Sequence, residues 1–155
     1  MTKFSRQSIP SFQFKREDIM SKEQNIAALQ RQGEAIATGK LEALRQVFAE
    51  NVVDHDPAPD QAPGPEGYIQ FFGGLRTAFP DLAVSVDYMV TDDDNVAMAY
   101  TLTGTHNGPL MGIPATGKKV KARGMQIARF KDGLIVERWG STDELGILKQ
   151  IGVIK

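Results

Sequence analysis

Apolar residues recur at intervals of three and four positions through the first half of the chain, and at intervals of two through much of the second half. The first spacing is that of one face of an α-helix, and the second is that of one face of a β-strand. The helical spacing predicts three helices, at Ser21 to Thr38, Leu41 to Glu50 and Pro65 to Phe79. Between the last two, residues 52–55 resemble a short strand and the proline-dense run 56–65 is expected to be a loop.

The second half of the chain predicts strands and one closing helix. The strands are expected at residues 82–90, 96–105, 120–131 and 134–142, joined in part by hairpin turns. The closing helix is expected from Asp143 to Gly152. Helices followed by antiparallel strands indicate an α+β domain, in which a curved antiparallel or mixed sheet wraps around the N-terminal helices and encloses an internal pocket.

The run from Gly104 to Gly117 separates two of these strands and holds four glycines and two prolines. Glycine and proline are unfavourable inside helices and strands, so the run is expected to be a long connection, of a length that is often functional. Its apolar residues Leu110, Met111 and Ile113 are expected to cover a cavity.

Strand alternation predicts which side chains point into that cavity. His106 shares its parity with the bulky residues Tyr100 and Leu102, so it is expected on their face. In the last strand, Trp139 and Asp143 share a parity, and both are expected to line the cavity.

Length, charge and composition narrow the classes of protein. The 155 residues fit one domain, expected at 21–155, preceded by an extension at 1–20 that is either flexible or docks its phenylalanines on a neighbouring subunit. A net charge of -1 gives no reason to expect nucleic acid or an anionic membrane as partner. The absence of cysteine excludes disulfides and thiolate chemistry and suits the cytoplasm, and no segment of the sequence is predicted to be a signal peptide or a membrane span.

Few residues are candidates for chemistry. Asp143 beside an indole could have a raised pKa and exchange protons, or it could simply cap the closing helix. His106 could orient an oxyanion or be structural. In Asp54-His55-Asp56, alternate side chains point to opposite faces, which argues against a metal site; we expect His55 to point inward or to contact the proline loop, with both aspartates facing water.

Six segments of the chain, taken together, resemble the SnoaL-like polyketide cyclases, also called the ester cyclase family. They lie at residues 53–57, 64–67, 79–82, 104–108, 112–118 and 132–139. The resemblance runs from about residue 22 to 152. It implies the curved-sheet cone of the nuclear-transport-factor-two-like superfamily and a homodimer formed through the outer face of the sheet.

The resemblance also implies a reaction. Members of this family close the last ring of aromatic polyketides by an intramolecular aldol condensation, without a metal or organic cofactor. Asp143 corresponds to the acidic residue that acts as general acid/base, and His106 matches the histidine of the Gly-Thr-His motif. Residues expected to bind substrate are His55, Tyr68, Phe72, Tyr100, Met111, Arg123 and Trp139.

Three functions stay open at the level of sequence. The first is a cofactor-independent cyclase, lyase or isomerase acting on a small carbonyl-bearing apolar molecule. The second is a non-catalytic binding protein with the same pocket, in which Asp143 only caps a helix. The third is epoxide-hydrolase or isomerase chemistry, which needs an aspartate and an arginine around one water, with Arg123 as the arginine if it faces inward. We expect an enzyme.

Overall fold

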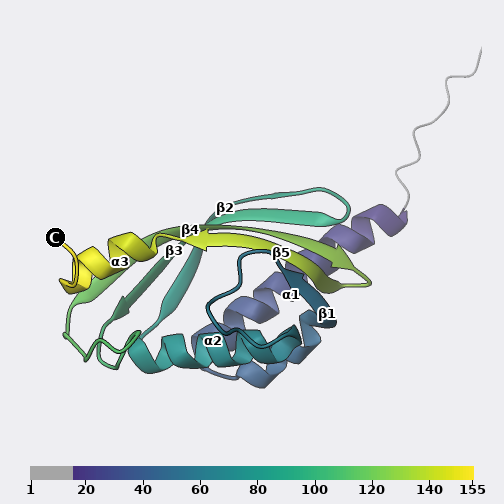
Figure 1. Ribbon diagram of the computed structural model, residues 1–155. Helices are drawn as coiled ribbons and strands as arrows, with labels where there is room; N and C mark the ends of the chain where they lie inside the picture. The colour runs from purple at the N-terminus through teal and green to yellow at the C-terminus, as the bar shows by residue number, and fades with distance from the viewer. Residues whose placement is uncertain (1–15) are drawn as a thin grey trace, which may run out of the picture.

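The computed structural model describes residues 16–155, with side chains from residue 21 onward, so the expectations for residues 1–15 lie outside the described residues. The elements in chain order are α1 (Arg16–Thr38), η1 (Leu41–Gln46), β1 (Phe48–Asp54), α2 (Gly64–Ala78), β2 (Ala83–Thr91), β3 (Asn95–Thr105), β4 (Lys119–Lys131), β5 (Leu134–Thr142) and α3 (Glu144–Ile151) (Figure 1). Helix α1 begins at Arg16, five residues before the predicted start at Ser21.

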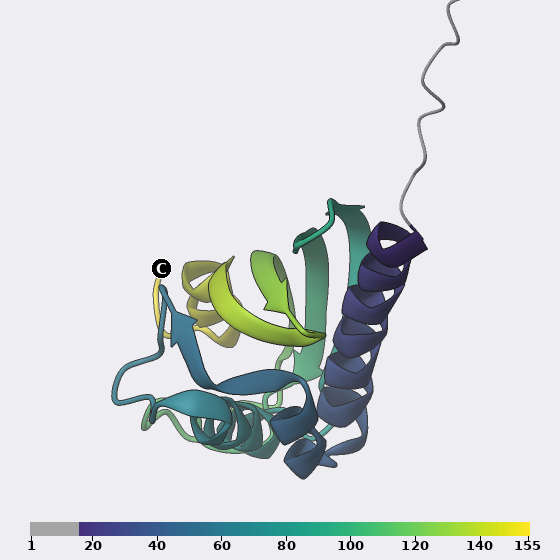
Figure 2. The ribbon, with the colours of Figure 1, turned by 90° about the vertical axis from the view of Figure 1, so that its right-hand side faces the viewer.

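The five strands form one mixed sheet in the order β1-β5-β4-β3-β2. Strand β1 is parallel to β5, and the other neighbouring pairs are antiparallel. The sheet curves over α1 and α2 without closing on itself, as the two views at right angles show (Figures 1 and 2). The predicted α+β class and curved mixed sheet are confirmed.

Strand β4 defines the two faces of the sheet, because its buried and exposed residues alternate along its whole length. Its even-numbered residues, such as Ala122 and Ala128, are buried and belong to the two hydrophobic clusters that include α1, α2 and α3. We call this side the concave face. The odd-numbered residues, such as Met125 and Ile127, are exposed on the outer face.

One predicted helix is wrong over its second part. The chain from Leu41 is a short 3-10 helix that ends at Gln46, and Phe48 already belongs to β1. The amide of Ile135 donates to the carbonyl of Val47, which ties this segment to β5. A spacing of three and four over only eight residues could not distinguish the two structures, and pairing with a distant strand decided it.

Among the helices that the structure describes, none is long and apolar enough to cross a membrane.

Candidate functional site

A cluster of polar side chains on the concave face lies where β1 ends beside β5. Asp54 is the last residue of β1 and pairs in register with Arg138 of β5. The adjoining Val53 pairs with Glu137 on the outer face, so alternation turns the Asp54 side chain inward. This carboxylate is 8% exposed.

Four N–H contacts reach the two oxygens of the Asp54 carboxylate. Oδ1 accepts from the Asp56 amide at 3.1 Å and from Nη1 of Arg138 at 3.0 Å. Oδ2 accepts from the same nitrogen at 3.2 Å and from Nε2 of Gln61 at 3.2 Å. Four donor contacts match the four lone-pair sites of a carboxylate, so the group is fully hydrogen-bonded as an anion.

The pKa of Asp54 follows from these partners. Burial acts against the charged form, but the positive charge of Arg138, the nearby Tyr68 hydroxyl and the hydrogen bonds from Asp56 and Gln61 outweigh burial, so the pKa of this carboxyl lies below its usual value. Asp54 is therefore an anion at neutral pH.

Arg138 is held in turn by its neighbours on the concave face. Its Nε donates to Oε1 of Gln126 at 3.3 Å. The guanidinium lies over Gly140, where a Cβ would collide with it. The amide of Gly140 donates to Asp56, which fixes the start of the proline loop against β5.

Tyr68, in the second turn of α2, completes this cluster of polar side chains. We call Asp54, Gln61, Tyr68, Gln126 and Arg138 the Asp54 group. Its ring stacks on Phe48 with centroids 3.8 Å apart and planes at 6°. The hydroxyl is buried without a hydrogen-bond partner among the described residues. Burial, followed by the charge of Asp54, raises the pKa of this hydroxyl far above its ordinary value, so the group is protonated at neutral pH.

A hollow of about 130 Å³ lies between Asp54, Tyr68 and the proline loop. It is lined by Val52, Asp54, Pro57, Gln61, Ala62, Pro63, Gly64 and Tyr68. It brings an anionic carboxylate and a neutral phenol to the wall of one hollow. This combination can accept a proton and donate a hydrogen bond in the same place.

Two of the predicted binding residues lie on the concave face with this group. Tyr68 and Tyr100 are both buried, and the Tyr100 hydroxyl lies 2.7 Å from Oγ1 of Thr142. Gly124 leaves the space that the Tyr100 ring occupies. Phe72 is partly buried between the two hydrophobic clusters, so it supports the wall rather than the polar end.

Two other predicted binding residues lie on the outer face, and the inward placement expected for them is wrong. Trp139 pairs with Ile127 there and stacks on His55, with ring centroids 4.3 Å apart. His55 contacts Glu137 at 3.0 Å, and Arg129 forms an ion pair with the same carboxylate. The predicted alternation of side chains along β5 is correct, but the face predicted for Trp139 is the wrong one, because β5 carries bulky residues at both parities.

Two further residues expected at the pocket are exposed. Arg123, an odd-numbered residue of β4, lies on the outer face. Met111 is 75% exposed at the tip of its loop and has a positive φ of 49°. Its neighbours Leu110 and Ile113 are partly buried against the second hydrophobic cluster. The loop therefore covers hydrophobic core with two of its three apolar residues.

His106 is completely buried on the concave side, as its parity predicted. Its Nδ1 lies 3.0 Å from Oγ1 of Thr116, and its carbonyl accepts the amides of Thr116 and Gly117. The ring packs beside Phe79 at 5.6 Å between centroids. These contacts join the two ends of the glycine-rich loop.

Asp143 caps helix α3, which confirms that alternative. Its Oδ1 accepts the amide of Gly146 at 2.8 Å, and the residue is exposed. Its own amide donates to Arg123, whereas the amide of His106 donates to Lys118. Five residues of extended backbone separate those two partners, or about 16 Å, so the structure does not bring Asp143 and His106 together.

The sequence reading missed Asp54, Arg138, Gln61 and Gln126. It placed Asp54 in water because aspartate is rarely buried. The available indication was Arg138 itself, a charged residue whose parity is opposite to that of Trp139 and Glu137. Buried charges occur in pairs, so an inward arginine predicts an inward acid.

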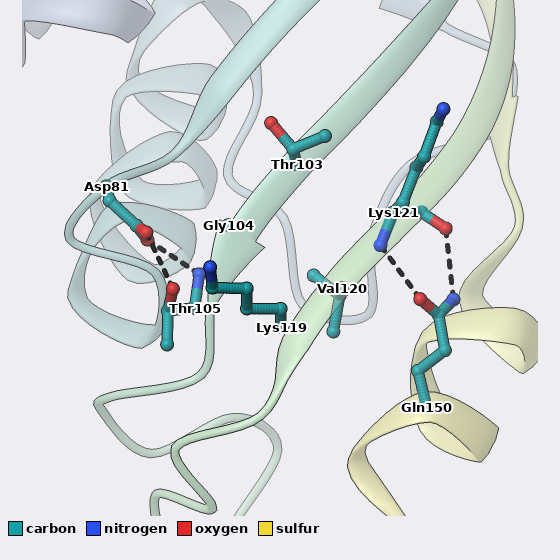
Figure 3. Close-up of a pocket in the computed structure, with 8 residues that line it drawn as sticks. All are labelled: Asp81, Thr103, Gly104, Thr105, Lys119, Val120, Lys121 and Gln150. Carbon is teal, nitrogen blue, oxygen red and sulfur yellow. Dashed lines mark hydrogen bonds between the residues drawn. The ribbon is translucent and has the colours of Figure 1, made fainter.

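A second, wider hollow of about 400 Å³ lies where β3 and β4 meet α3 (Figure 3), with Asp81 and Gln150 at its sides. Asp81 accepts the amide and hydroxyl of Thr105 at 2.6 and 2.7 Å, and Gln150 exchanges two hydrogen bonds with the backbone of Lys121. The ammonium group of Lys119 extends toward Asp81 and that of Lys121 away from it (Figure 3). These polar groups stabilise the fold, so the smaller hollow is the better site for chemistry.

Within the part of the chain that the structure describes, no three His, Cys, Asp or Glu side chains converge in a way that could hold a metal ion.

Comparison with known proteins supplies the family. The family model described as SnoaL-like polyketide cyclase matches residues 26–151. The chain is 28% identical over 133 residues to the aklanonic acid methyl ester cyclase DauD of Streptomyces sp. (strain C5), covering 82% of this chain and 81% of that protein. It is 29% identical over 90 residues to the nogalonic acid methyl ester cyclase of Streptomyces nogalater, covering 57% of this chain and 67% of that one.

Solved structures agree with the fold. IdmH from Streptomyces antibioticus superposes with a TM-score of 0.72 at 31% identity, covering 83% of this chain and 99% of that chain. TsrD from Streptomyces laurentii superposes with a TM-score of 0.76 at 23% identity, covering 92% of this chain and 100% of that chain. The family match spans most of the chain and the curved sheet is the same, so this protein belongs to the SnoaL-like polyketide cyclase family.

Proposed function

We propose that this protein is a cofactor-independent cyclase that closes a ring in a small, apolar, carbonyl-bearing molecule by proton transfer beside Asp54. The observation that carries the proposal is a buried carboxylate held as an anion at the wall of a hollow on the concave face. The family match supports a cyclase-type reaction, and we assign the base of that reaction to the Asp54 carboxylate, which is 8% exposed.

An intramolecular aldol condensation needs little more than these groups. A base removes a proton from a carbon beside a carbonyl, the resulting enolate attacks a second carbonyl of the same molecule, and the new alkoxide takes the proton back. A site that holds the substrate in a folded conformation supplies the proximity that this step requires. Asp54 is the proposed proton acceptor, because its carboxylate is ionised and lines the hollow.

The roles expected for Asp143 and His106 stay predictions from the resemblance. Asp143 is exposed and occupied by the cap of α3, and the His106 ring contacts Thr116 and Phe79. These positions favour Asp54 as the acid/base residue. A comparison of carboxylate-free variants at positions 54 and 143 decides between them.

A second candidate function rests on Arg138. Water activation on an epoxide needs an aspartate and an arginine around one water, and the Asp54–Arg138 pair at 3.0 Å supplies both inside the concave face. Arg123, the arginine first considered, lies on the outer face. The mass of the product separates the two reactions, because hydrolysis adds one water and cyclisation by aldol addition leaves the mass unchanged.

The wild-type protein tests the proposal with the compounds on which its relatives are named. Aklanonic acid methyl ester and nogalonic acid methyl ester are incubated with the protein and followed by chromatography with mass detection. We expect a new product of the same mass as the substrate. Recovery of unchanged compound that has nevertheless bound to the protein would contradict the enzyme and support the binding protein.

We also propose a homodimer formed through the outer face of the sheet. Apolar side chains run across four strands there in the row Trp139, Ile127, Ala97 and Val90, and a second row contains Met125, Ala99 and Tyr88. Tyr88 is 70% exposed, Met125 68% and Val90 52%. A contiguous apolar patch of this kind is unusual on a monomer, and a second copy of the chain would cover it.

A further inference from the structure

Four buried side-chain atoms have no hydrogen-bond partner among the described residues. They are Oε1 of Gln32, the Tyr68 hydroxyl, Nε2 of His106 and Nε2 of Gln126. Buried polar groups are almost always paired, so each exception asks for a reason. Of these four residues, Tyr68 lines the hollow beside Asp54, and the other three line neither of the two hollows described above.

The position of the Tyr68 hydroxyl is fixed by its surroundings. The ring is clamped by its stack on Phe48, and the preceding residue, Gly67, packs so closely on the carbonyl of Ala62 that a Cβ would collide with it. The backbone and the ring are both immobilised, so the hydroxyl keeps one place relative to Asp54. A donor held in place before substrate arrives needs no reorganisation during the reaction.

The hydroxyl lies close enough to the Asp54 carboxylate to lower the pKa of that group, yet it makes no hydrogen bond of ordinary geometry with it. Both Asp54 oxygens are filled by N–H contacts from Arg138, Gln61 and Asp56. Gln61 is the contact that comes from the middle of the proline loop, and it also lines the hollow. Displacement of this side chain by a substrate would free one lone pair of the carboxylate.

We propose that Tyr68 is a second catalytic residue, whose hydroxyl donates a hydrogen bond to the carbonyl oxygen of an enolisable substrate while Asp54 removes the proton from the adjacent carbon. This inference rests on the proposed function. It follows from the geometry, because the acidic carbon and the carbonyl oxygen of such a substrate are neighbours, as are the Asp54 carboxylate and the Tyr68 hydroxyl.

The step balances with these groups alone. The carbon–hydrogen bond breaks, its proton goes to the Asp54 oxygen freed by Gln61, and its electron pair moves to the carbonyl oxygen that Tyr68 contacts. Tyr68 keeps its own proton throughout. The enolate carbon then forms a carbon–carbon bond to the second carbonyl, and Asp54 returns the proton to the alkoxide.

The first test removes the hydroxyl and keeps the ring. Tyr68→Phe is expected to lower kcat/KM on aklanonic acid methyl ester by about 100-fold or more, as for loss of one oxyanion donor. Its melting temperature is expected to be unchanged or higher, because an unpaired buried hydroxyl has been removed. Tyr88→Phe, on the outer face and away from Asp54, is the matched control: it keeps the apolar ring that the proposed dimer would cover and should keep wild-type turnover.

The second test does not depend on turnover. In Asp54→Asn the neutral amide mimics the protonated carboxyl of the intermediate. The phenolate oxygen of 4-nitrophenolate mimics the enolate oxygen. We expect this variant to bind 4-nitrophenolate with a shift of its visible absorbance, and the double variant Asp54→Asn/Tyr68→Phe to bind it at least tenfold more weakly.

The outcomes separate the inference from the proposed function. Tyr68→Phe turnover within threefold of wild type, together with loss of turnover in Asp54→Asn, would overturn the role of Tyr68 and leave the cyclase intact. If the wild type turns over neither methyl ester, binding of 4-nitrophenolate still decides: equal binding by the single and double variants, or binding by neither, would overturn the inference.

Discussion

Asp54 and Arg138 show how a single ion pair can be both a structural and a chemical feature. Removing one partner of a buried pair leaves an uncompensated charge, which is strongly destabilising, whereas the intact pair adds little net stability. Here the pair also fixes the direction of the carboxylate, because Arg138 is itself held by Gln126 over Gly140. The pair therefore positions the proposed base, and its cost in desolvation is offset by the surrounding hydrogen bonds.

The lowered pKa of Asp54 predicts how stability depends on pH. The folded state favours the anion, so its contribution is fully present above the unfolded pKa of about 4 and is lost as the pH falls through the lower folded value. We expect the difference in free energy of unfolding between wild type and Asp54→Asn to be constant above about pH 5 and to shrink below about pH 4. Urea unfolding between pH 2.5 and 7 measures it, and a difference independent of pH would contradict the account.

The sequence predicts well which residues of a strand share a face. It does not show which of the two faces the helices cover. The parity of His106, Tyr100 and Leu102 was predicted correctly, and all three are buried. In β5 both parities contain bulky or charged residues, so the pattern alone did not show that Arg138 faces the helices and Trp139 faces outward. Which face is covered depends on the helices, far away in sequence.

At the scale of elements, α3 is specified by its two ends. Asp143 accepts the Gly146 amide at the first turn, and Gly146 has no Cβ to obstruct the carboxylate. Gly152 ends the helix with a left-handed φ of 88°. Both ends were predicted from sequence, because capping depends on residues within four positions of each other.

The cap predicts the stability of variants at position 143. Asp143→Ala is expected to lower the free energy of unfolding by about 1 kcal/mol, and Asp143→Ser to restore most of it, because serine is also a good N-cap. Urea unfolding followed by circular dichroism measures both. A serine variant no more stable than the alanine variant would contradict the capping role.

The start of β1 was the element least accessible to sequence. Its first residue, Phe48, and the preceding Val47 continue a helical spacing, yet they pair with β5 more than eighty residues later. Such parallel pairing is non-local and leaves no periodic mark in a short segment. The strands of the second half were predicted to within one residue or so because each has long alternating runs and adjacent turns.

At the scale of the whole molecule, the two faces of the sheet have different tasks. The concave face packs on the three helices and holds the Asp54 group, while the outer face presents apolar rows across β5, β4, β3 and β2. The proposed reaction and the proposed dimer contact therefore lie on opposite faces of one sheet.

This separation predicts a variant that changes assembly alone. Ile127→Asp places a charge in the centre of the outer apolar row and is expected to convert the dimer to a monomer while the circular dichroism spectrum stays the same. Lys121→Asp, at the polar end of the same face, is the control and should remain dimeric. Sedimentation velocity measures both, and a wild-type protein that is monomeric at micromolar concentration would contradict the proposed dimer.

The central claim, that the acid/base group is Asp54 on the concave face, is tested most directly by paired kinetics of Asp54→Asn and Asp143→Ser. Both variants remove a carboxylate, and the second keeps the helix cap. With aklanonic acid methyl ester as substrate, we expect kcat/KM to fall by about 100-fold or more in Asp54→Asn, as for loss of a general base, and to stay within threefold of wild type in Asp143→Ser. Full turnover in Asp54→Asn together with its loss in Asp143→Ser would contradict the claim and place the chemistry at the start of α3.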